Sequence, residues 1–167
     1  GIGDTVIFLP FIKAISKKFQ VPVSLLVKKN SRAKEFLIYT NYIDEIIHLE
    51  RDNKVNQKHD GLKGFFKLAS DLKKYNFDKV FIFNSSLRYN LICRLAGIKE
   101  IFQYPLFKKQ NQHITEPAKA IIKKYLEIET NDNPEIQIDN DLVQKSVLKY
   151  NMNNDELNVL LGIGGSG

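Results

Sequence analysis

Residues 77–104 read FDKVFIFNSSLRYNLICRLAGIKEIFQY, two strand-like segments on either side of a helix-like one. The run DKVFIF (78–83) is apolar and rich in Val, Ile and Phe, as a buried parallel strand should be, and EIFQY (100–104) is similar. The Asn-Ser-Ser at 84–86 supplies candidates for a helix N-cap, and Gly97 marks the expected helix end. This stretch therefore predicts a strand, a helix and a second, parallel strand.

The same alternation continues toward the N-terminus. VPVSLLV (21–27) and IDEIIHL (43–49) are strand-like, and SRAKEFLIY (31–39) between them is helix-like. A further helix is expected at 62–74, with one apolar face made of Leu62, Phe65, Phe66, Ala69 and Leu72. The order of elements favours an α/β fold with a Rossmann-like, doubly wound parallel sheet covered by helices on both faces.

Beyond residue 104, the pattern predicts two more helices. Thr115 is a candidate cap for the first, and Pro117 falls in its first turn, where a missing N–H costs little. Its expected apolar face consists of Ala118, Ile121, Ile122, Tyr125 and Leu126. The second helix is expected in DLVQKSVLKYN (141–151), after a connecting segment.

The last residues resemble the start of a second domain. LNVLLGIGGSG (157–167) is an apolar strand that leads into a glycine-rich loop, and such a loop normally opens a helix whose N-terminus binds phosphate. We therefore expect an N-terminal domain at 1–154, and the first strand and phosphate loop of a C-terminal domain at 155–167.

Composition narrows the class of protein. The 167 residues are 43% hydrophobic and 26% charged, which suits one globular domain or slightly more. No apolar run approaches the roughly 20 residues of a bilayer span, and residues 1–19 lack a signal-peptide pattern, so we expect a cytosolic protein. The single cysteine, Cys93, lies among apolar residues and is expected to be a buried thiol. His48, His59 and His113 lack ligand spacing, so no metal site is expected.

The net charge of +6 is unevenly distributed. Seven basic residues between positions 13 and 34 lie in a stretch without an acidic residue, namely Lys13, Lys17, Lys18, Lys28, Lys29, Arg32 and Lys34. This stretch fits either an anion-binding surface or an ordinary solvated face. Nucleic acid is the less favoured partner, because the aromatic residues lie in apolar strands rather than among the basic residues.

Four segments, taken together in order and spacing, resemble glycosyltransferase family 9, the ADP-heptose:lipopolysaccharide heptosyltransferases and their relatives. Gly3-Asp4, followed by an apolar stretch with Pro10 and a helix ending in Lys-Lys-Phe, is similar to the family's opening. Residues 77–104 resemble its strand, helix and Leu-Ala-Gly turn, although Asn-Ser stands at 84–85 where Gln-Gly is common. His113 and Glu116 resemble its His-x-x-Glu, and VLLGIGGSG resembles the donor-domain phosphate loop without its usual His-Pro.

This resemblance implies the N-terminal, acceptor-side half of a GT-B glycosyltransferase. It implies a loop at residues 1–4 after a first strand that is absent from the sequence, and it implies an isolated chain without activity. The implied reaction is an inverting transfer of a heptose-like sugar from a nucleotide-diphosphate donor, such as ADP-heptose, to a lipopolysaccharide-type acceptor. No cofactor or essential metal is implied. The implied location is the cytoplasm, with peripheral contact to the inner face of the cytoplasmic membrane.

The expected site residues follow from the same reading. The resemblance assigns the general base to Asp4, whereas the residues alone fit equally well a carboxylate that caps the following helix. Ser86 and Arg88, just beyond a buried strand, are candidates for binding an anionic acceptor, together with His113. Backbone N–H groups in the final loop are candidates for binding the donor diphosphate, the residues concerned being Gly162, Gly164, Gly165 and Ser166.

Each assignment has an alternative. The sequence is also consistent with Arg88 as a surface residue that faces solvent. It is equally consistent with Glu116 as an acidic residue that offsets the helix dipole in the first turn of its helix. The glycine loop fits a plain tight turn. The whole chain fits a non-catalytic Rossmann-like module that binds a nucleotide or another anion.

Overall fold

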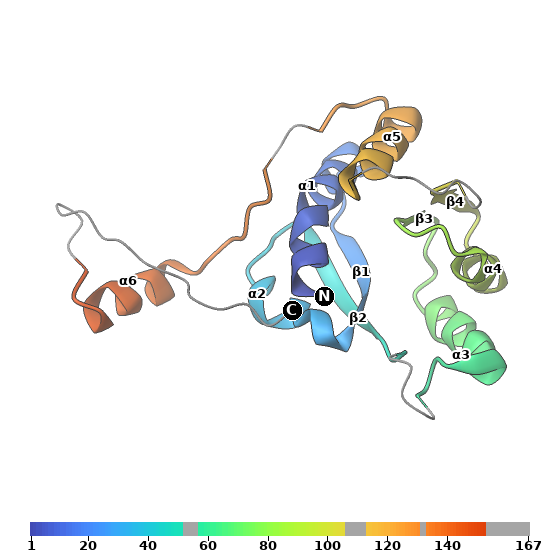
Figure 1. Cartoon of the computed structure of the whole chain (residues 1–167), viewed down its shortest axis with the longest axis horizontal. Helices are drawn as coiled ribbons and strands as arrows, with labels where there is room; N and C mark the ends of the chain where they lie inside the picture. Colours follow the sequence, from blue (N-terminus) through green and yellow to red (C-terminus); the bar gives the residue numbers. More distant parts are fainter. Residues whose placement is uncertain (52–56, 106–112, 131–132, 153–167) are drawn as a thin grey trace. The chain divides into compact units, whose positions relative to one another are not determined.

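The computed structural model describes residues 1–51, 57–105, 113–130 and 133–152 (Figure 1). The chain divides into two compact units, Gly1–Ile136 and Gln137–Gly167, and the second is described only as far as Met152. The expected domain boundary at 154 and the segment 155–167 therefore lie outside the described residues.

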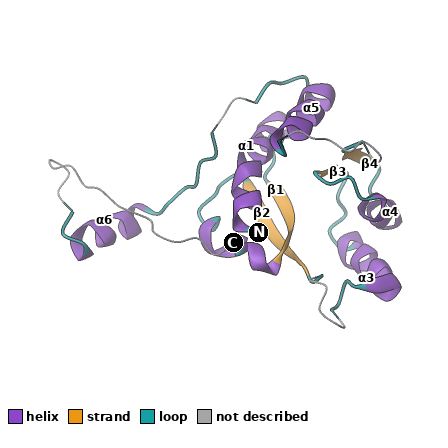
Figure 2. Ribbon diagram, in the orientation of Figure 1, coloured by secondary structure: helices purple, strands orange, loops and turns teal. Residues whose placement is uncertain are grey.

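The first unit alternates helices and strands (Figure 2). Its elements in chain order are α1 (Ile2–Phe19), β1 (Val23–Lys28), the 3₁₀ turn η1 (Lys29–Ser31), α2 (Ala33–Phe36), β2 (Ile43–Leu49), α3 (Gly61–Lys73), β3 (Lys79–Ile82), α4 (Leu87–Leu95), β4 (Glu100–Gln103) and α5 (Thr115–Leu126). The described part of the second unit contains α6 (Asn140–Lys149).

All paired strands are parallel, as the sequence predicts. β1 pairs with β2, with Leu26 opposite Ile47, and β3 pairs with β4, with Phe81 opposite Phe102. Among the described residues, hydrogen bonds join the strands into these two pairs rather than into one continuous sheet. The α/β class and the Rossmann-like arrangement are confirmed, since helices connect each pair of parallel strands.

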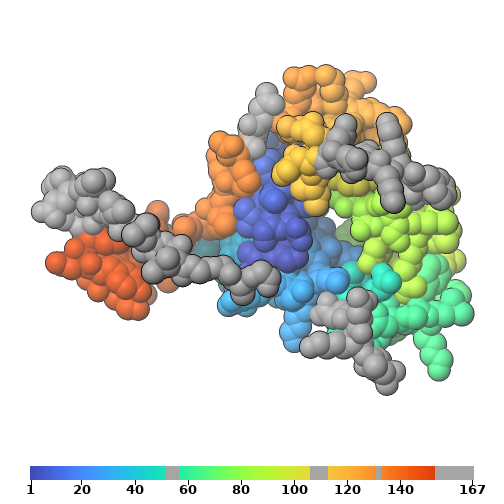
Figure 3. All heavy atoms as spheres, in the orientation of Figure 1, coloured from blue at the N-terminus to red at the C-terminus, as the bar shows by residue number. Residues whose placement is uncertain are grey.

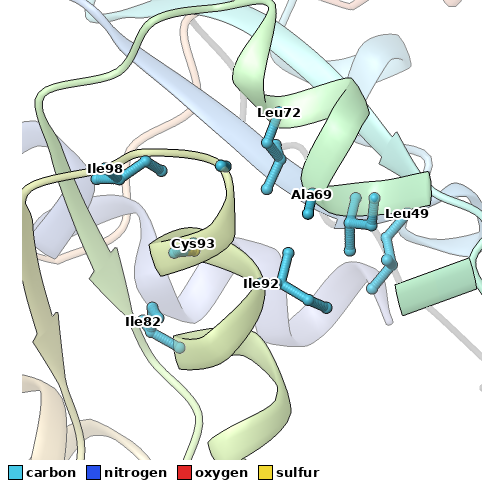
Figure 4. Close-up of a cluster of buried hydrophobic side chains, with 9 residues drawn as sticks. Leu49, Ala69, Leu72, Ile82, Ile92, Cys93 and Ile98 are labelled. Atoms are coloured by element: carbon cyan, nitrogen blue, oxygen red, sulfur yellow. The ribbon is translucent and has the colours of Figure 1, made fainter. Parts of the chain in front are cut away.

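Side-chain alternation along the strands creates two apolar layers. Phe81 of β3 and Val23 of β1 contact the cluster of α1 and α5, which includes the buried residues Phe11 and Ile122. The other faces of the strands contribute to a second cluster with α3 and α4, whose members include Leu49, Ala69, Leu72, Ile82, Ile92, Cys93 and Ile98 (Figure 4). Helices thus cover both faces of the strands, as expected for a doubly wound fold.

Cys93 is buried, as predicted, at 5% exposure in the cluster of α3 and α4. Burial raises the pKa of its thiol to about 11, so the thiol is protonated at neutral pH. The helix that carries Cys93 ends as expected, because Gly97 follows it with a φ of 87° in the left-handed region.

Several local expectations were wrong. Residues 1–4 were expected as a loop, but α1 begins at Ile2 and Asp4 lies in its first turn. Only Ala33–Phe36 of the expected helix at 31–39 is α-helical: Arg32, with a φ of 52°, prevents an earlier start, and Leu37, with a φ of −106° and a ψ of 6°, ends the helix. The cap of α5 is Ile114 rather than Thr115.

The apolar face of α3 is also rotated from the expected one. Leu62 and Phe66 are 74% and 57% exposed, whereas Gly64 and Leu68 are buried. Gly64 explains the rotation, since a Cβ at this position would lie 2.1 Å from the carbonyl carbon of His59. The helix can approach the preceding loop this closely only through a residue without a side chain.

Candidate functional site

Asp4 lies in the first turn of α1. The N-terminal part of the chain, in dark blue, lies on the face that Figure 3 shows. Its side chain is 66% exposed, and Oδ2 accepts a hydrogen bond of 2.7 Å from the amino group of Gly1. This contact is the one expected of an acidic residue that caps a helix start. The exposure also leaves the carboxylate accessible to a substrate hydroxyl, so the position is compatible with both readings of Asp4.

Ser86 is the N-cap residue of α4, and its backbone rather than its hydroxyl fixes the turn. Its N–H donates to Asn84 Oδ1 at 2.7 Å, and its carbonyl accepts from Gln103 Nε2 at 2.9 Å. The Gln103 amide also accepts from Asn90 Nδ2 at 2.9 Å. These bonds connect the start of α4 to β4, and the Ser86 hydroxyl makes no cap hydrogen bond.

Arg88, in the first turn of α4, contacts the loop before α3. Its Nη2 donates to the carbonyls of His59 and Gly61 at 3.1 and 2.9 Å, and its guanidinium lies 5.3 Å from the centre of the Phe65 ring. Arg88 is therefore not a freely solvated side chain, which was the alternative for this residue. An anionic ligand would have to share the guanidinium with two backbone carbonyls.

The loop that Arg88 contacts includes a buried histidine that sequence analysis did not single out for any role. His59 is 2% exposed; its Nδ1 accepts from the Glu50 N–H at 3.0 Å, and its Nε2 lies 3.4 Å from Asp71 Oδ2. Because Nδ1 is an acceptor, Nε2 carries the proton and donates to Asp71. Lys58, at 2.8 Å, also binds this carboxylate. The cluster connects the end of β2 to α3.

His113 lies immediately before α5. Its Nδ1 is 2.8 Å from Thr115 Oγ1, and its carbonyl accepts from the Glu116 N–H at 3.0 Å. Lys119, one turn into the helix, donates to Glu116 Oε1 at 3.0 Å. The start of α5 therefore combines a positive helix end, a cationic side chain and an imidazole.

His113, Thr115 and Lys119, but not Glu116, line a cavity of about 320 Å³ within the first unit. Ile7, Pro10 and Phe11 of α1 supply an apolar wall. His113, Thr115 and Lys119 supply polar groups from the start of α5, and the segment after α5 contributes Thr130, Asn133 and Pro134. Of the predicted site residues within the described part of the chain, only His113 lines this cavity.

Asp4 is connected to the same cavity through α1. It precedes Ile7 by three residues, so the two lie on one face of the helix, about 4.5 Å apart along the axis. Asp4 and the polar groups of the cavity are thus carried by two helices that pack against each other through Phe11 and Ile122. Within the described part of the chain, Ser86 and Arg88 form no hydrogen bond with Asp4 or His113, and they belong to a separate polar network at the start of α4.

Sequence reasoning missed Thr130, Asn133 and Lys119. Thr130 and Asn133 occur in a segment read only as a connection, and Lys119 resembles any surface lysine on an amphipathic helix. No local pattern identifies them, because the fold alone brings them to α1. The predicted phosphate loop, with Gly162, Gly164, Gly165 and Ser166, lies outside the described residues.

In the structure, acidic side chains pair with some of the basic residues between positions 13 and 34. Lys13 pairs with Glu135 at 2.7 Å, and Arg32 forms a bidentate ion pair with Glu35. Lys17, Lys18, Lys29 and Lys34 are exposed. In the part of the chain that the structure describes, no group of three or more His, Cys, Asp or Glu residues is placed to hold a metal ion, and no helix is long and apolar enough to cross a membrane.

Comparison with known proteins identifies a solved structure with a similar fold. The chain is similar to the crystal structure of the glycosyl transferase family 9 from Veillonella parvula DSM 2008, with a TM-score of 0.66 and 14% sequence identity. The match covers 94% of this chain and 49% of that chain, so this chain spans about half the length of that protein. No family model and no curated protein matches the sequence. At this identity, the likeness establishes a shared fold.

Proposed function

We propose that this chain is the acceptor-side half of a glycosyltransferase. The observation that carries the proposal is the fold, which matches one half of a family 9 glycosyl transferase over 94% of the chain. The ordered sequence motifs around Asp4, residues 77–104, His113 and the final glycine loop add independent support. In this proposal, the donor-binding half begins at the glycine loop.

The proposed reaction is an inverting transfer of a heptose-like sugar. An acceptor hydroxyl forms a bond to the anomeric carbon, the bond from that carbon to the diphosphate breaks, and the diphosphate leaves with the electron pair. The hydroxyl proton passes to the carboxylate of Asp4, which is accessible at the start of α1. The N–H groups of Gly162, Gly164, Gly165 and Ser166 would stabilise the leaving diphosphate.

The proposed substrates are a nucleotide-diphosphate sugar, of the ADP-heptose kind, and an anionic lipopolysaccharide-type acceptor. We assign His113 to contact with the acceptor, and its position in the lining of the cavity beside α1 supports this assignment. Arg88 and Ser86 are assigned to the same task at the start of α4. The reaction would take place in the cytoplasm, at the inner face of the membrane that carries the acceptor.

A second candidate is a non-catalytic module that binds a nucleotide or another anion. The observation that favours it is the position of Asp4 in the first turn of α1, where the helix dipole is sufficient to explain an acidic residue. In that case, Asp4 has no partner in a reaction, and the polar groups around α5 serve binding alone.

Substitution Asp4→Asn in a protein that joins this chain to its donor-binding half separates the two candidates. As a general base, Asp4 is needed for turnover but not for donor binding, so we expect turnover to fall by about 10²-fold or more with donor affinity unchanged. The measurement is transfer of sugar from ADP-heptose to a lipid-linked acceptor, followed by mass spectrometry.

Asp141→Asn is the matched control, since Asp141 is also an exposed acid in the first turn of a helix. It should leave turnover unchanged. Wild-type turnover in the Asp4 variant would reduce Asp4 to a cap residue, and absence of transfer by the unmodified protein from any nucleotide-diphosphate sugar would favour the binding module.

Peripheral contact with an anionic membrane is part of the proposal. The exposed residues Lys17, Lys18, Lys29 and Lys34 are the groups that would make it. We expect binding to vesicles of anionic lipid that weakens steeply as salt rises, because exposed charges are screened over about 8 Å at physiological ionic strength. Vesicle co-sedimentation over a salt series measures this, and binding that salt leaves unchanged would contradict it.

A further inference from the structure

Helices α3 and α4 expose large apolar side chains that do not belong to the core. Leu62 and Phe66 of α3 point away from the buried cluster, because the close approach at Gly64 turns a different side of the helix inward. On α4, a leucine recurs every four residues, at positions 87, 91 and 95, and each is at least 43% exposed. Both helices pack against the strands through other residues, so these side chains are not needed to hold them in place.

The exposed apolar residues of the two helices adjoin one another. The guanidinium of Arg88 in α4 lies 5.3 Å from the ring centre of Phe65 in α3, so the helices meet along this line (Figure 1). Phe66 follows directly, with its ring centre 5.3 Å from that of Phe65, and Leu91 lies one turn beyond Arg88 on the same side of α4. We name the resulting surface the α3–α4 face, and it consists of Leu62, Phe66, Leu87, Leu91 and Leu95.

Basic side chains accompany the α3–α4 face. The two helices contain three lysines, two arginines and one acidic residue, Asp71. The Asp71 carboxylate is only 16% exposed and forms ion pairs with three lysines, so it contributes little negative charge to the surface. The fully exposed charged residues of α3 and α4 are all positive, namely Lys63, Lys67, Lys73 and Arg94.

This combination of residue types favours a lipid surface as the partner. Lysine is depleted in protein–protein interfaces, whereas at a bilayer its long side chain reaches the headgroups while its carbon atoms stay in the apolar layer. Leucine and phenylalanine beside lysine and arginine are typical of helices that lie at the surface of an anionic membrane. A second copy of the chain is disfavoured, because contact of this face with itself would bring like charges together.

We propose that the α3–α4 face binds an anionic lipid bilayer. Its leucine and phenylalanine side chains enter the boundary between headgroups and acyl chains, and its basic side chains contact lipid phosphates. The inference rests on the membrane contact of the proposed function and names an apolar surface for it, separate from the basic stretch. That stretch lies on α1 and around α2, which pack on the opposite face of β1 and β2.

Co-sedimentation of the whole protein with vesicles is the first test. Vesicles of phosphatidylcholine with phosphatidylglycerol should bind the protein, and vesicles of phosphatidylcholine alone should bind it at least about tenfold more weakly, because the charge attraction is then lost. Joint substitution Leu91→Gln and Leu95→Gln should weaken binding to the anionic vesicles by about tenfold, since two apolar side chains no longer enter the bilayer. The matched control is Leu142→Gln with Leu148→Gln, which removes two exposed leucines from α6 and should leave binding unchanged.

A tryptophan probe shows which surface enters the bilayer, because the sequence contains no tryptophan. Leu91→Trp places the probe on the α3–α4 face, and Val21→Trp places it at an exposed position between α1 and β1, beside the basic stretch. With anionic vesicles, the emission of the Leu91→Trp variant should shift to shorter wavelength and be quenched by brominated lipid. The emission of the Val21→Trp variant should show neither change.

The outcomes distinguish this inference from the wider proposal. Quenching of the Val21 probe alone would keep the membrane contact of the proposed function and overturn the α3–α4 face, and absence of binding to anionic vesicles would overturn both. A dimer in analytical ultracentrifugation that the joint leucine substitution abolishes would mean that a second copy covers the face, and this also overturns the inference. Sugar transfer is not needed for any of these measurements, so its failure leaves the inference standing.

Thermal melting of the joint leucine variant checks that the fold is intact. Exposed leucines stabilise the fold little, so the melting temperature should match that of the unmodified protein. A clear fall would mean that these side chains are packed within the protein, and this result would contradict a free α3–α4 face.

Discussion

Helices α5 and α6 have similar lengths and apolar patterns but differ in how much of their surface is buried. Both are short and amphipathic, and the pattern of apolar residues predicts a helix in each case. α5 buries Ala118, Ile121, Ile122 and Leu126, whereas α6 buries none of its residues and leaves Leu148 80% exposed. Amphipathicity therefore predicts the helix, and only a packing partner turns its apolar face into a source of stability.

The largest expected difference between the two helices is the response to loss of an apolar side chain. Ile122→Ala in α5 removes a fully buried side chain from the cluster with α1, and it should lower the free energy of unfolding by about 2–5 kcal/mol. Leu148→Ala in α6 should change it by less than about 0.5 kcal/mol. Urea denaturation measures both. Equal losses would mean that α6 is packed as tightly as α5.

A smaller effect is expected from the partly exposed ion cluster around Asp71 of α3, another packed helix. Burial by itself would raise the pKa of Asp71, but hydrogen bonds from Lys58, His59, Lys74 and Lys67 outweigh it and hold this pKa well below its ordinary value. A lowered pKa in the folded state stabilises the protein above the unfolded pKa of about 4, and this stability is lost as the pH falls below that value.

Asp71→Asn should therefore lower stability at neutral pH by about 1–2 kcal/mol and reduce the loss of stability between about pH 4 and pH 2. Asp141→Asn in α6 is the comparison, since its carboxylate is exposed and lies on a helix without buried residues. Urea denaturation over a pH series tests this. An acid response that Asp71→Asn leaves unchanged would show that the cluster does not stabilise the fold through this carboxylate.

The smallest effect is expected at the start of α6. Asp139 Oδ1 accepts from the N–H groups of Asp141 and Leu142 at 2.8 and 3.2 Å, so Asp139→Ala removes a helix cap worth about 1 kcal/mol. Hydrogen exchange should show faster exchange in α6, with the global unfolding midpoint unchanged, because this helix buries nothing. A shift of the global midpoint would indicate that α6 unfolds together with the first unit.

Elsewhere in the chain, too, the sequence pattern predicts where an element forms, and tertiary contacts decide its limits and which of its residues are buried. The runs at 21–27, 43–49, 78–83 and 100–104 each contain an observed strand, because a parallel strand buried on both faces needs a continuous apolar run. The helix at 31–39 was overestimated, since Arg32 before it and Leu37 after it both leave the helical conformation and apolar periodicity does not report such backbone breaks. The apolar face of α3 was predicted with the wrong members, because Gly64 packs against His59 from a loop outside the helix.

In the candidate site as well, one residue was named from the sequence and another was found only in the structure. His113 was named as a candidate through its resemblance to a family motif, and it lines the cavity, although its role stays a prediction. Thr130 was not identified, because a threonine in a connecting segment has no distinguishing local pattern.

The sequence by itself determined the class of fold, the positions of most elements and the burial of Cys93, because periodicity and apolar content depend on residues that are neighbours along the chain. Tertiary structure decided which helices bury their faces, that Arg88 binds the carbonyls of His59 and Gly61, and that the start of α5 meets α1 around a cavity. These features join residues from about 30 to more than 100 positions apart, and no local preference of the chain specifies such contacts.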